Sequence, residues 1–169
     1  MNKLISFILN NTVNLLDFIY SGRDLQRFWV LEVIARSPYF AFLSVLHFKE
    51  SLGIKNDKTM FLMKEHFYQA INETEHLKEM EKRGGDEFWI DRFFARHLVL
   101  FYYWIMVFYY FFSPATAYDV NIKIEEHAFK TYSKYLKDNP NDQKIKEIAQ
   151  DELNHVQELT QALSMLTSI

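Results

Sequence analysis

This chain of 169 residues contains long segments in which apolar and polar positions are mixed, and one long segment that has no charged residue. In the first twenty residues, MNKLISFILNNTVNLLDFIY, apolar side chains alternate with asparagines, whereas residues 98–112, LVLFYYWIMVFYYFF, are fifteen uncharged positions in a row. Turn residues are rare, with Gly 4 and Pro 3, so β-hairpins lack the residues that they need. The pattern predicts an all-α fold of six helices, at about 3–20, 24–51, 57–83, 87–112, 114–137 and 141–166.

The few turn signals fall between these segments. Ser21-Gly22, Gly53 and Gly84-Gly85 end helices, and Asn56 or Asp57 can cap the third helix. Ser113 followed by Pro114 is typical of an N-cap with proline in the first helical turn. The run DNPND at 138–142 predicts a tight turn before the last helix.

The uncharged run is shorter than the ~20 residues that span a bilayer, and it is rich in Tyr and Trp. It predicts a helix in a membrane interface, a dimer interface or a deeply buried core helix. The start of the chain has neither a continuous apolar core nor a small-residue cleavage site, so it predicts no targeting peptide. The first helix can extend the apolar surface with Leu4, Ile5, Phe7, Ile8, Leu15, Leu16, Phe18 and Ile19.

Composition excludes several classes of site. Cysteine is absent, which excludes disulfides, thiolate zinc sites and cysteine-ligated iron–sulfur clusters. A net charge of −3 without a basic patch predicts no nucleic-acid partner. Any metal site in this chain must therefore use oxygen and imidazole ligands.

The motif Glu-x-x-His occurs twice, as Glu73 with His76 and as Glu152 with His155. The i, i+3 spacing places both side chains of a pair on one helix face. Counting from the predicted turns at ~1.5 Å per residue, Glu125 lies level with Glu152, and Glu32 lies about one turn from the level of Glu73. Four glutamates and two histidines can therefore meet at one level of a four-helix bundle.

Burying four carboxylates and two imidazoles costs free energy unless cations neutralise them. Ferritin-like bundles solve this with two metal ions, taking one Glu from each of two helices and Glu-x-x-His from each of the other two. Oxygen and imidazole ligands suit iron or manganese. The order Glu32, Glu73/His76, Glu125, Glu152/His155 supplies the complete set, so the spacing predicts a di-metal centre. The alternative is a metal-free, membrane-binding helical module.

Several blocks of the sequence resemble the alternative oxidase family, most closely its plastid terminal oxidase branch. They are RFWVLEVIARSPYFAFLSVLHFKESLG (27–53), NETEHLKEMEKRGGDEFWIDRFFARH (72–97), YYWIMVFYYFFSPATAY (102–118), IEEHAFKTYSKYL (124–136) and DELNH (151–155). The resemblance implies a single alternative-oxidase-like domain over 1–169: a ferritin-like di-iron bundle with two additional helices forming a membrane-interface surface. It implies a quinol oxidase that reduces O₂ to water and pumps no protons.

Residue by residue, the resemblance implies the six iron ligands that spacing also selects: Glu32, Glu73, His76, Glu125, Glu152 and His155. It implies that Asn72 and Asp151 support those ligands and that Tyr132, two helical turns after Glu125, lies close to the metals. Residues that fall where the family lines its quinol pocket are Arg27, Leu31, His127, Ala128 and Thr131. A homodimer and a monotopic attachment to an inner, cytoplasmic or thylakoid-type membrane are also implied.

The chain departs from the family pattern in three places. Only fourteen residues separate Leu136 from Asp151, where the family has a longer segment, and Ala149-Gln150 stands where an Arg is common. The N-terminal extension of organelle-targeted members is missing, which suggests a bacterial or viral protein or a shortened chain. None of these departures removes a ligand. Two other di-iron functions remain open, a quinone-type hydroxylase and a ferroxidase.

Overall fold

The computed structural model describes residues 3–167 and contains six helices, with no strand among those residues. They are α1 (Lys3–Ile19), α2 (Asp24–Ser51), α3 (Asp57–Lys82), α4 (Trp89–Phe112), α5 (Pro114–Asp138) and α6 (Gln143–Thr167). The sequence prediction of an all-α fold with six helices is confirmed, and each boundary lies within two residues of its expected place.

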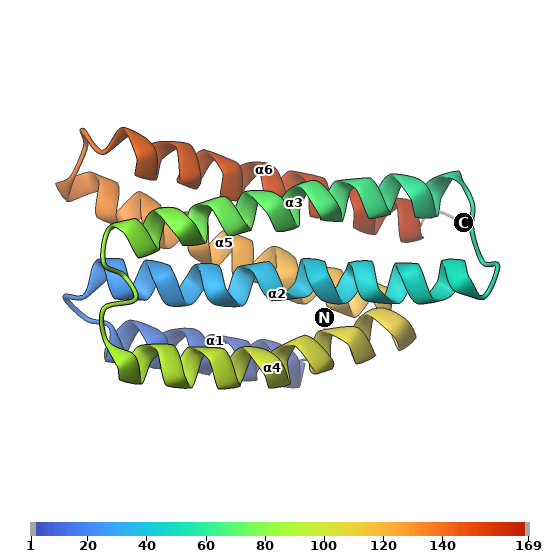
Figure 1. The fold of residues 1–169 in the computed structure, drawn as a ribbon, viewed down its shortest axis with the longest axis horizontal. Helices are drawn as coiled ribbons and strands as arrows, with labels where there is room; N and C mark the ends of the chain where they lie inside the picture. The colour runs from blue at the N-terminus through green and yellow to red at the C-terminus, as the bar shows by residue number, and fades with distance from the viewer. Residues whose placement is uncertain (1–2, 168–169) are drawn as a thin grey trace.

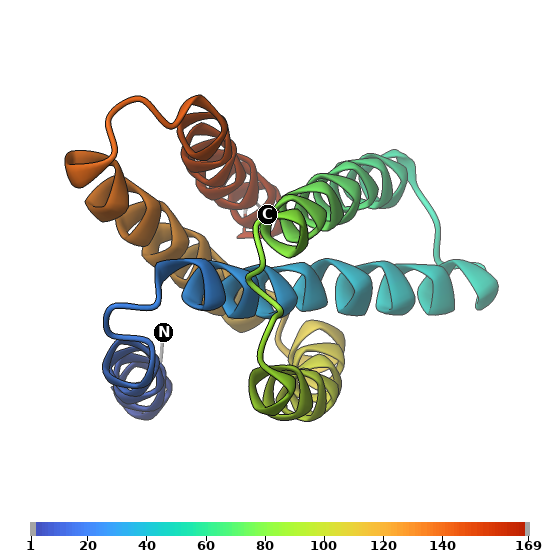
Figure 2. The ribbon, with the colours of Figure 1, turned by 60° about the vertical axis from the view of Figure 1, so that its left-hand side comes forward.

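Helices α2, α3, α5 and α6 form a four-helix bundle, and α1 and α4 both lie on one outer side of it, separated from each other in Figure 2 (Figures 1 and 2). Two hairpins make up the bundle, α2 with α3 and α5 with α6, and within each hairpin the helices run in opposite directions. Helices α2 and α5 also run in opposite directions. The hairpins follow from the short loops, because a loop of a few residues returns the chain beside the helix it has just left.

The helix ends show which turn signals act through side chains. The Asn56 side chain accepts a hydrogen bond from the Thr59 amide at 2.8 Å, which confirms one of the two expected caps of α3. Pro114 occupies the first turn of α5 as predicted, but the Ser113 side chain makes no capping hydrogen bond. The Thr116 amide donates instead to the Ser113 carbonyl at 3.0 Å, and the two hydroxyls pair with each other at 2.8 Å.

Two loops hold the ends of the bundle. Gly84 has a φ of 83°, and a Cβ on Gly85 would lie only 2.7 Å from the Leu25 carbonyl oxygen, so both positions require glycine. The short turn before α6 is fixed by Asp142, whose carboxylate accepts from the Ile145 amide at 3.2 Å and from Arg83 at 2.6 Å. The α5–α6 hairpin thus closes without a longer segment.

The bundle core consists of two apolar clusters. One contains Tyr39, Phe42, Tyr110 and Tyr118, and the other contains Phe28, Trp29, Tyr132 and Ile145. Twelve polar or charged residues are buried in the described part of the chain, and these include four glutamates. Such burial requires compensation by hydrogen bonds or counter-charges.

The outer side formed by α1 and α4 is rich in exposed apolar side chains. On α4 they include Trp89, Phe93, Phe94, Leu98, Phe101, Trp104, Phe108 and Phe112, and on α1 they include Phe7, Leu15 and Phe18. By length and composition two helices are able to cross a membrane: α2, whose apolar window is 72% buried in the protein, and α4, whose window is 17% buried. One of the roles expected for the uncharged run 98–112 was a deeply buried core helix. In α4 that role is limited to a few residues such as Met106 and Tyr110.

Candidate metal centre

Four glutamates and two histidines converge at the centre of the bundle. Glu73, Glu125 and Glu152 are completely buried, and Glu32, His76 and His155 are at most 4% exposed. Each of the four bundle helices contributes at least one of them. The offset of about one turn between Glu32 and Glu73 that residue counting gives does not keep their carboxylates apart. These six residues do lie together, as the spacing predicts.

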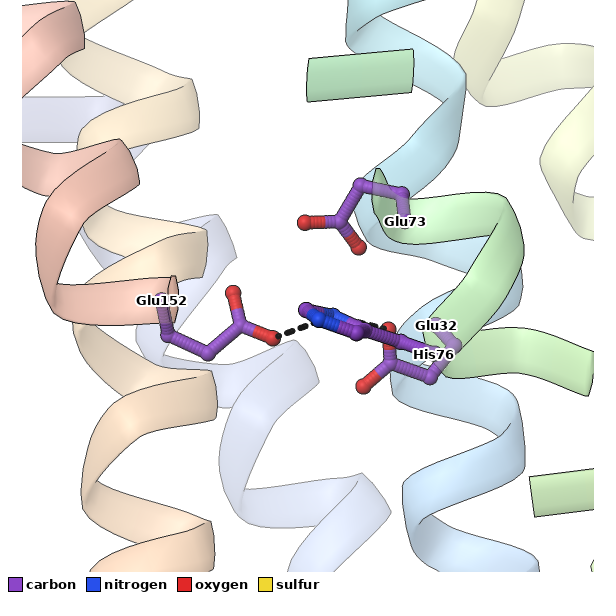
Figure 3. Close-up of side chains that lie close together, drawn as sticks. All are labelled: Glu32, Glu73, His76 and Glu152. Carbon is purple, nitrogen blue, oxygen red and sulfur yellow. Dashed lines mark ion pairs between the residues drawn. The ribbon is translucent and has the colours of Figure 1, made fainter. Parts of the chain in front are cut away.

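The six side chains form two overlapping groups. Within each group one ligand atom per residue lies within 4.8 Å of all the others. One group is Glu32, Glu73, His76 and Glu152, drawn in Figure 3, and the other is Glu73, Glu125, Glu152 and His155. Glu73 and Glu152 belong to both groups. The arrangement thus has two candidate metal positions that share two carboxylates.

Hydrogen bonds distinguish the shared glutamates from the other two. Both carboxylate oxygens of Glu73 and of Glu152 are buried without a hydrogen bond. Glu32 and Glu125 each have only one such oxygen, Oε2, because a tyrosine hydroxyl donates to the Oε1 of each. The shared glutamates can therefore offer two oxygens to cations, and Glu32 and Glu125 can offer one.

The two tyrosines come from opposite helices. Tyr132 on α5 donates to Glu32 on α2, and Tyr39 on α2 donates to Glu125 on α5 at 2.7 Å. Both tyrosines are completely buried. Sequence analysis identified Tyr132 but missed Tyr39, although Tyr39 follows Glu32 by seven residues just as Tyr132 follows Glu125.

The outer nitrogen of His76 is held by a carboxylate. His76 Nε2 lies 3.1 Å from Asp151 Oδ2, and the Asn72 amide donates to the same oxygen at 3.3 Å. The hydrogen bond with His76 is the main reason that the pKa of Asp151 is lowered. A metal-binding histidine commonly has such a partner, which fixes its ring orientation. The structure thus brings together the two supporting residues that the resemblance names.

Burial and crowding shift the ionisation of this cluster. Burial, with the charges of Glu152 and Glu73, raises the pKa of Glu32 to about 8 and also raises the pKa of Glu125. Burial alone would raise the pKa of Glu152, but the nearby imidazoles of His155 and His76 outweigh it and lower that pKa to about 2. Buried carboxylates at this density are stable as anions only with cations beside them.

The donor set fits metal ions. Eight carboxylate or imidazole atoms of the six residues are buried without a hydrogen bond, including His76 Nδ1 and His155 Nδ1. His155 Nδ1 lies 2.8 Å from Glu73 Oε1, and His76 Nδ1 lies 3.4 Å from Glu152 Oε1, so both nitrogens face the carboxylates. Unpaired acceptors that face one another are costly in a protein interior. Cations between them remove that cost.

Glu32 does not form an ion pair with a nearby arginine in place of a metal site. A buried Glu32 paired with Arg27 or Arg36 is excluded, because Arg27 binds Asp17 and Thr131 and the Arg36 guanidinium lies over the Phe40 ring. His66 is a buried histidine outside both groups: it is 1% exposed and bonds to Gln69 and to Tyr118.

The residues expected at a quinol pocket lie beside the metal cluster on α2 and α5. Arg27 donates to the Thr131 hydroxyl at 3.1 Å, and that hydroxyl lies 3.4 Å from His127 Nε2. Asp17 of α1, which sequence analysis did not select, contacts both Arg27 and His127. Leu31 and Ala128 are buried beside this polar set, at 3% and 1% exposure.

A cleft of about 330 Å³ reaches the cluster from another direction, between α3 and α6. Its lining is polar or acidic and includes His155. Burial and the charge of Glu158 raise the pKa of Glu65, which also lines this cleft. A second cleft, of about 230 Å³, lies on α2, α3 and α4 and is lined in part by Trp29, Arg36 and Arg96.

Comparison with known proteins agrees with this geometry. The chain is 45% identical over 131 residues to ubiquinol oxidase 4, chloroplastic/chromoplastic, of Arabidopsis thaliana, which covers 78% of this chain and 37% of the relative. The chain thus spans well under half the length of that curated relative. No solved structure matches the chain. The family model described as alternative oxidase matches residues 12–158, and these residues include all six cluster side chains. The chain belongs to the alternative oxidase family.

Proposed function

We propose that this chain is a di-iron quinol oxidase that oxidises a membrane quinol, reduces O₂ to water and pumps no protons. Residues 1–169 would form its single domain. The observation that carries the proposal is the pair of overlapping Glu/His groups in a member of the alternative oxidase family. The Arabidopsis relative named a ubiquinol oxidase supports the choice of substrate.

The six converging side chains would hold two iron ions. Glu32 and His76 would serve one position, Glu125 and His155 the other, and Glu73 and Glu152 both, in keeping with the number of free oxygens on each carboxylate. When bound, the iron pair supplies the redox chemistry that connects quinol to O₂, and no side chain in this cysteine-free protein can supply it alone.

The residues around the ligands would position them and hold protons. Asp151 orients the ring of His76 through Nε2, and Asn72 orients Asp151. The hydroxyl of Tyr132 keeps a proton on the Oε1 side of Glu32. Thr131, the residue before Tyr132 on α5, bonds to Arg27. The proposed quinol pocket and the metal cluster would thus be connected through α5.

The proposed quinol pocket comprises Arg27, Leu31, His127, Ala128 and Thr131. The Nε of Arg27 is buried without a hydrogen bond and is available to a quinol oxygen. Burial lowers the pKa of His127, so its imidazole is neutral at pH 7 and can accept a proton from a quinol. Leu31 and Ala128 supply an apolar wall.

The outer side of α1 and α4 would attach the protein to the membrane. An aromatic and aliphatic surface of this extent is typical of an interface with lipid, and Trp and Tyr favour the headgroup level. The attachment would be monotopic, on an inner, cytoplasmic or thylakoid-type membrane, and the protein would act as a homodimer. The side chains of Leu4, Ile5 and Ile8, expected on this surface, lie outside the described part of the chain.

Oxygen uptake with a short-chain quinol tests the proposal. The parent protein in detergent should consume O₂, and Glu125→Ala should not. Glu126→Ala is the matched control, because Glu126 is the next residue on α5, its side chain is 46% exposed and it pairs with Lys130 at the surface. Uptake by Glu125→Ala at the parental rate would refute the site. Turnover under ¹⁸O₂ separates an oxidase, whose label goes to water, from a hydroxylase, whose label enters the organic product.

A further inference from the structure

The metal centre has an internal two-fold relation that extends beyond the six ligands. Exchanging α2 with α5 and α3 with α6 converts the group of Glu32 and His76 into the group of Glu125 and His155. The opposite directions of α2 and α5 in Figure 1 are what a two-fold axis across the bundle requires. A residue that contacts the metal cluster from one helix therefore has a counterpart on the related helix, and the contacts of the two residues can be compared.

Tyr39 is the counterpart of Tyr132 under this exchange. Each tyrosine follows its own helix's glutamate by seven residues, about two turns, which keeps both on one face. Each donates its hydroxyl to the glutamate of the opposite helix, Tyr132 to Glu32 and Tyr39 to Glu125. Each is 0% exposed. Spacing, burial and hydrogen bonding thus agree for the two residues.

We infer that Tyr39 is a positioning residue for one of the two metal positions, as Tyr132 is for the other. This inference rests on the proposed di-iron function. The hydroxyl of Tyr39 occupies Oε1 of Glu125 and leaves Oε2, which has no hydrogen bond, to a single metal ion. A hydrogen bond to the non-coordinating oxygen fixes the carboxylate plane and reduces the negative charge on that ligand.

Tyr39 also contacts the second ligand of the same position. Its ring lies edge-on to the ring of His155, with centroids 5.8 Å apart. The Tyr39 side chain therefore touches both Glu125 and His155, which are the two ligands found only in that group. Removing the hydroxyl should disturb one metal position and leave the position of Glu32 and His76 unchanged.

The test is ⁵⁷Fe Mössbauer spectroscopy of the full chain in detergent, loaded anaerobically with ferrous ion. Asp151→Asn, which alters only the partner of His76, identifies the signal of the His76 position. Tyr132→Phe should shift that same signal, and Tyr39→Phe should shift the other one. Tyr39→Phe should also weaken binding of one of the two ions by about 10- to 100-fold in a chelator competition. Tyr110→Phe is the control, because it removes a buried hydroxyl that bonds to Tyr118 and to no metal-cluster residue among those described.

Each outcome decides the inference. If Tyr39→Phe lowers only the thermal midpoint, as Tyr110→Phe can, or shifts the His76 signal, Tyr39 has no positioning role of this kind. If Tyr39→Phe does not fold, 3-fluorotyrosine at position 39 keeps the shape and the hydroxyl, and it should shift the second signal. A fluorinated protein with the parental spectrum refutes the inference. A parent protein that binds no iron refutes the proposed function instead.

Discussion

The half of the metal centre on α2 and α3 and the half on α5 and α6 are alike in their ligands and different in what supports them. Both have a glutamate with one free oxygen, a shared glutamate, a histidine and a tyrosine received from the opposite hairpin. Only His76 has a carboxylate behind it, because Asp151 on α6 corresponds to Asn72 on α3. In the described part of the chain no side chain bonds to the outer nitrogen of His155, which lines the cleft.

The difference indicates which features the metals require and which are free to vary. A centre in which carboxylates neutralise two cations needs similar donors on both sides, so the six ligands and the two tyrosines repeat. A second carboxylate beside His155 would add negative charge to a cluster in which burial already raises the pKa of Glu32 and Glu125. The residue that corresponds to Asp151 in the other half is Asn72, whose amide is uncharged.

Loss of a shared glutamate should have the largest effect. Glu152→Gln keeps the size of the side chain but removes a ligand from both positions, so both ions should be lost. Oxygen uptake should fall by about 1,000-fold, equivalent to about 4 kcal/mol of activation free energy. Glu32→Gln and Glu125→Gln should each weaken one position, and to the same extent. Metal analysis after desalting checks this, and two bound irons in Glu152→Gln would contradict the sharing.

The two halves also differ at a position seven residues before each shared glutamate. It is His66 on α3 and the buried Ile145 on α6. Burial lowers the pKa of His66 from 6.5 to about 4, so the folded metal-free protein keeps this ring neutral. Its stabilising contribution is present above pH 6.5 and lost as pH falls towards 4, about 3 kcal/mol in all.

Urea unfolding of metal-free protein at several pH values measures that loss. His66→Gln cannot titrate, so the difference in unfolding free energy between it and the parent should change between pH 7 and pH 4. A difference that stays constant with pH would show that His66 does not resist protonation.

Iron should stabilise the folded bundle, because the six ligands converge only there. One ferrous ion at 100 times its dissociation constant adds about 2.7 kcal/mol to the free energy of unfolding, which corresponds to a rise of about 5–11 °C in the thermal midpoint. Anaerobic circular dichroism melting checks the rise. The same rise in Glu152→Gln would show that ferrous ion binds elsewhere.

Loss of the Asp151 carboxylate, which bonds to the outer nitrogen of His76, should have the smallest of these effects. Asp151→Asn should weaken iron binding by about 10- to 100-fold at one position, as measured by competition with a chelator. Glu147→Gln is the control, because Glu147 lies one helical turn earlier on α6 and pairs with the exposed Lys144. Equal affinities in the parent and Asp151→Asn would mean that the asymmetry between the halves has no consequence for metal binding.

The sequence by itself determined the helices and the ligand types. Scarce glycine and proline left six long segments, and the segments became helices α1 to α6 with boundaries close to those expected. The repeated Glu-x-x-His selected Glu73, His76, Glu152 and His155, because the i, i+3 spacing is a local property of one helix. Counting along the hairpins placed Glu125 level with Glu152 and placed Glu32 within about one turn of the level of Glu73.

Only the tertiary structure decided which residues meet across helices. The segment VLEVIARSPYF does not by itself predict that Tyr39 bonds to a glutamate 86 residues away. The sequence of α1 likewise does not predict that Asp17 contacts Arg27 and His127. Such contacts depend on how two helices are rotated and offset, and packing of the whole core sets both. Helix formation is governed by nearby residues, whereas the division of carboxylate oxygens between tyrosines and metals is governed by the bundle.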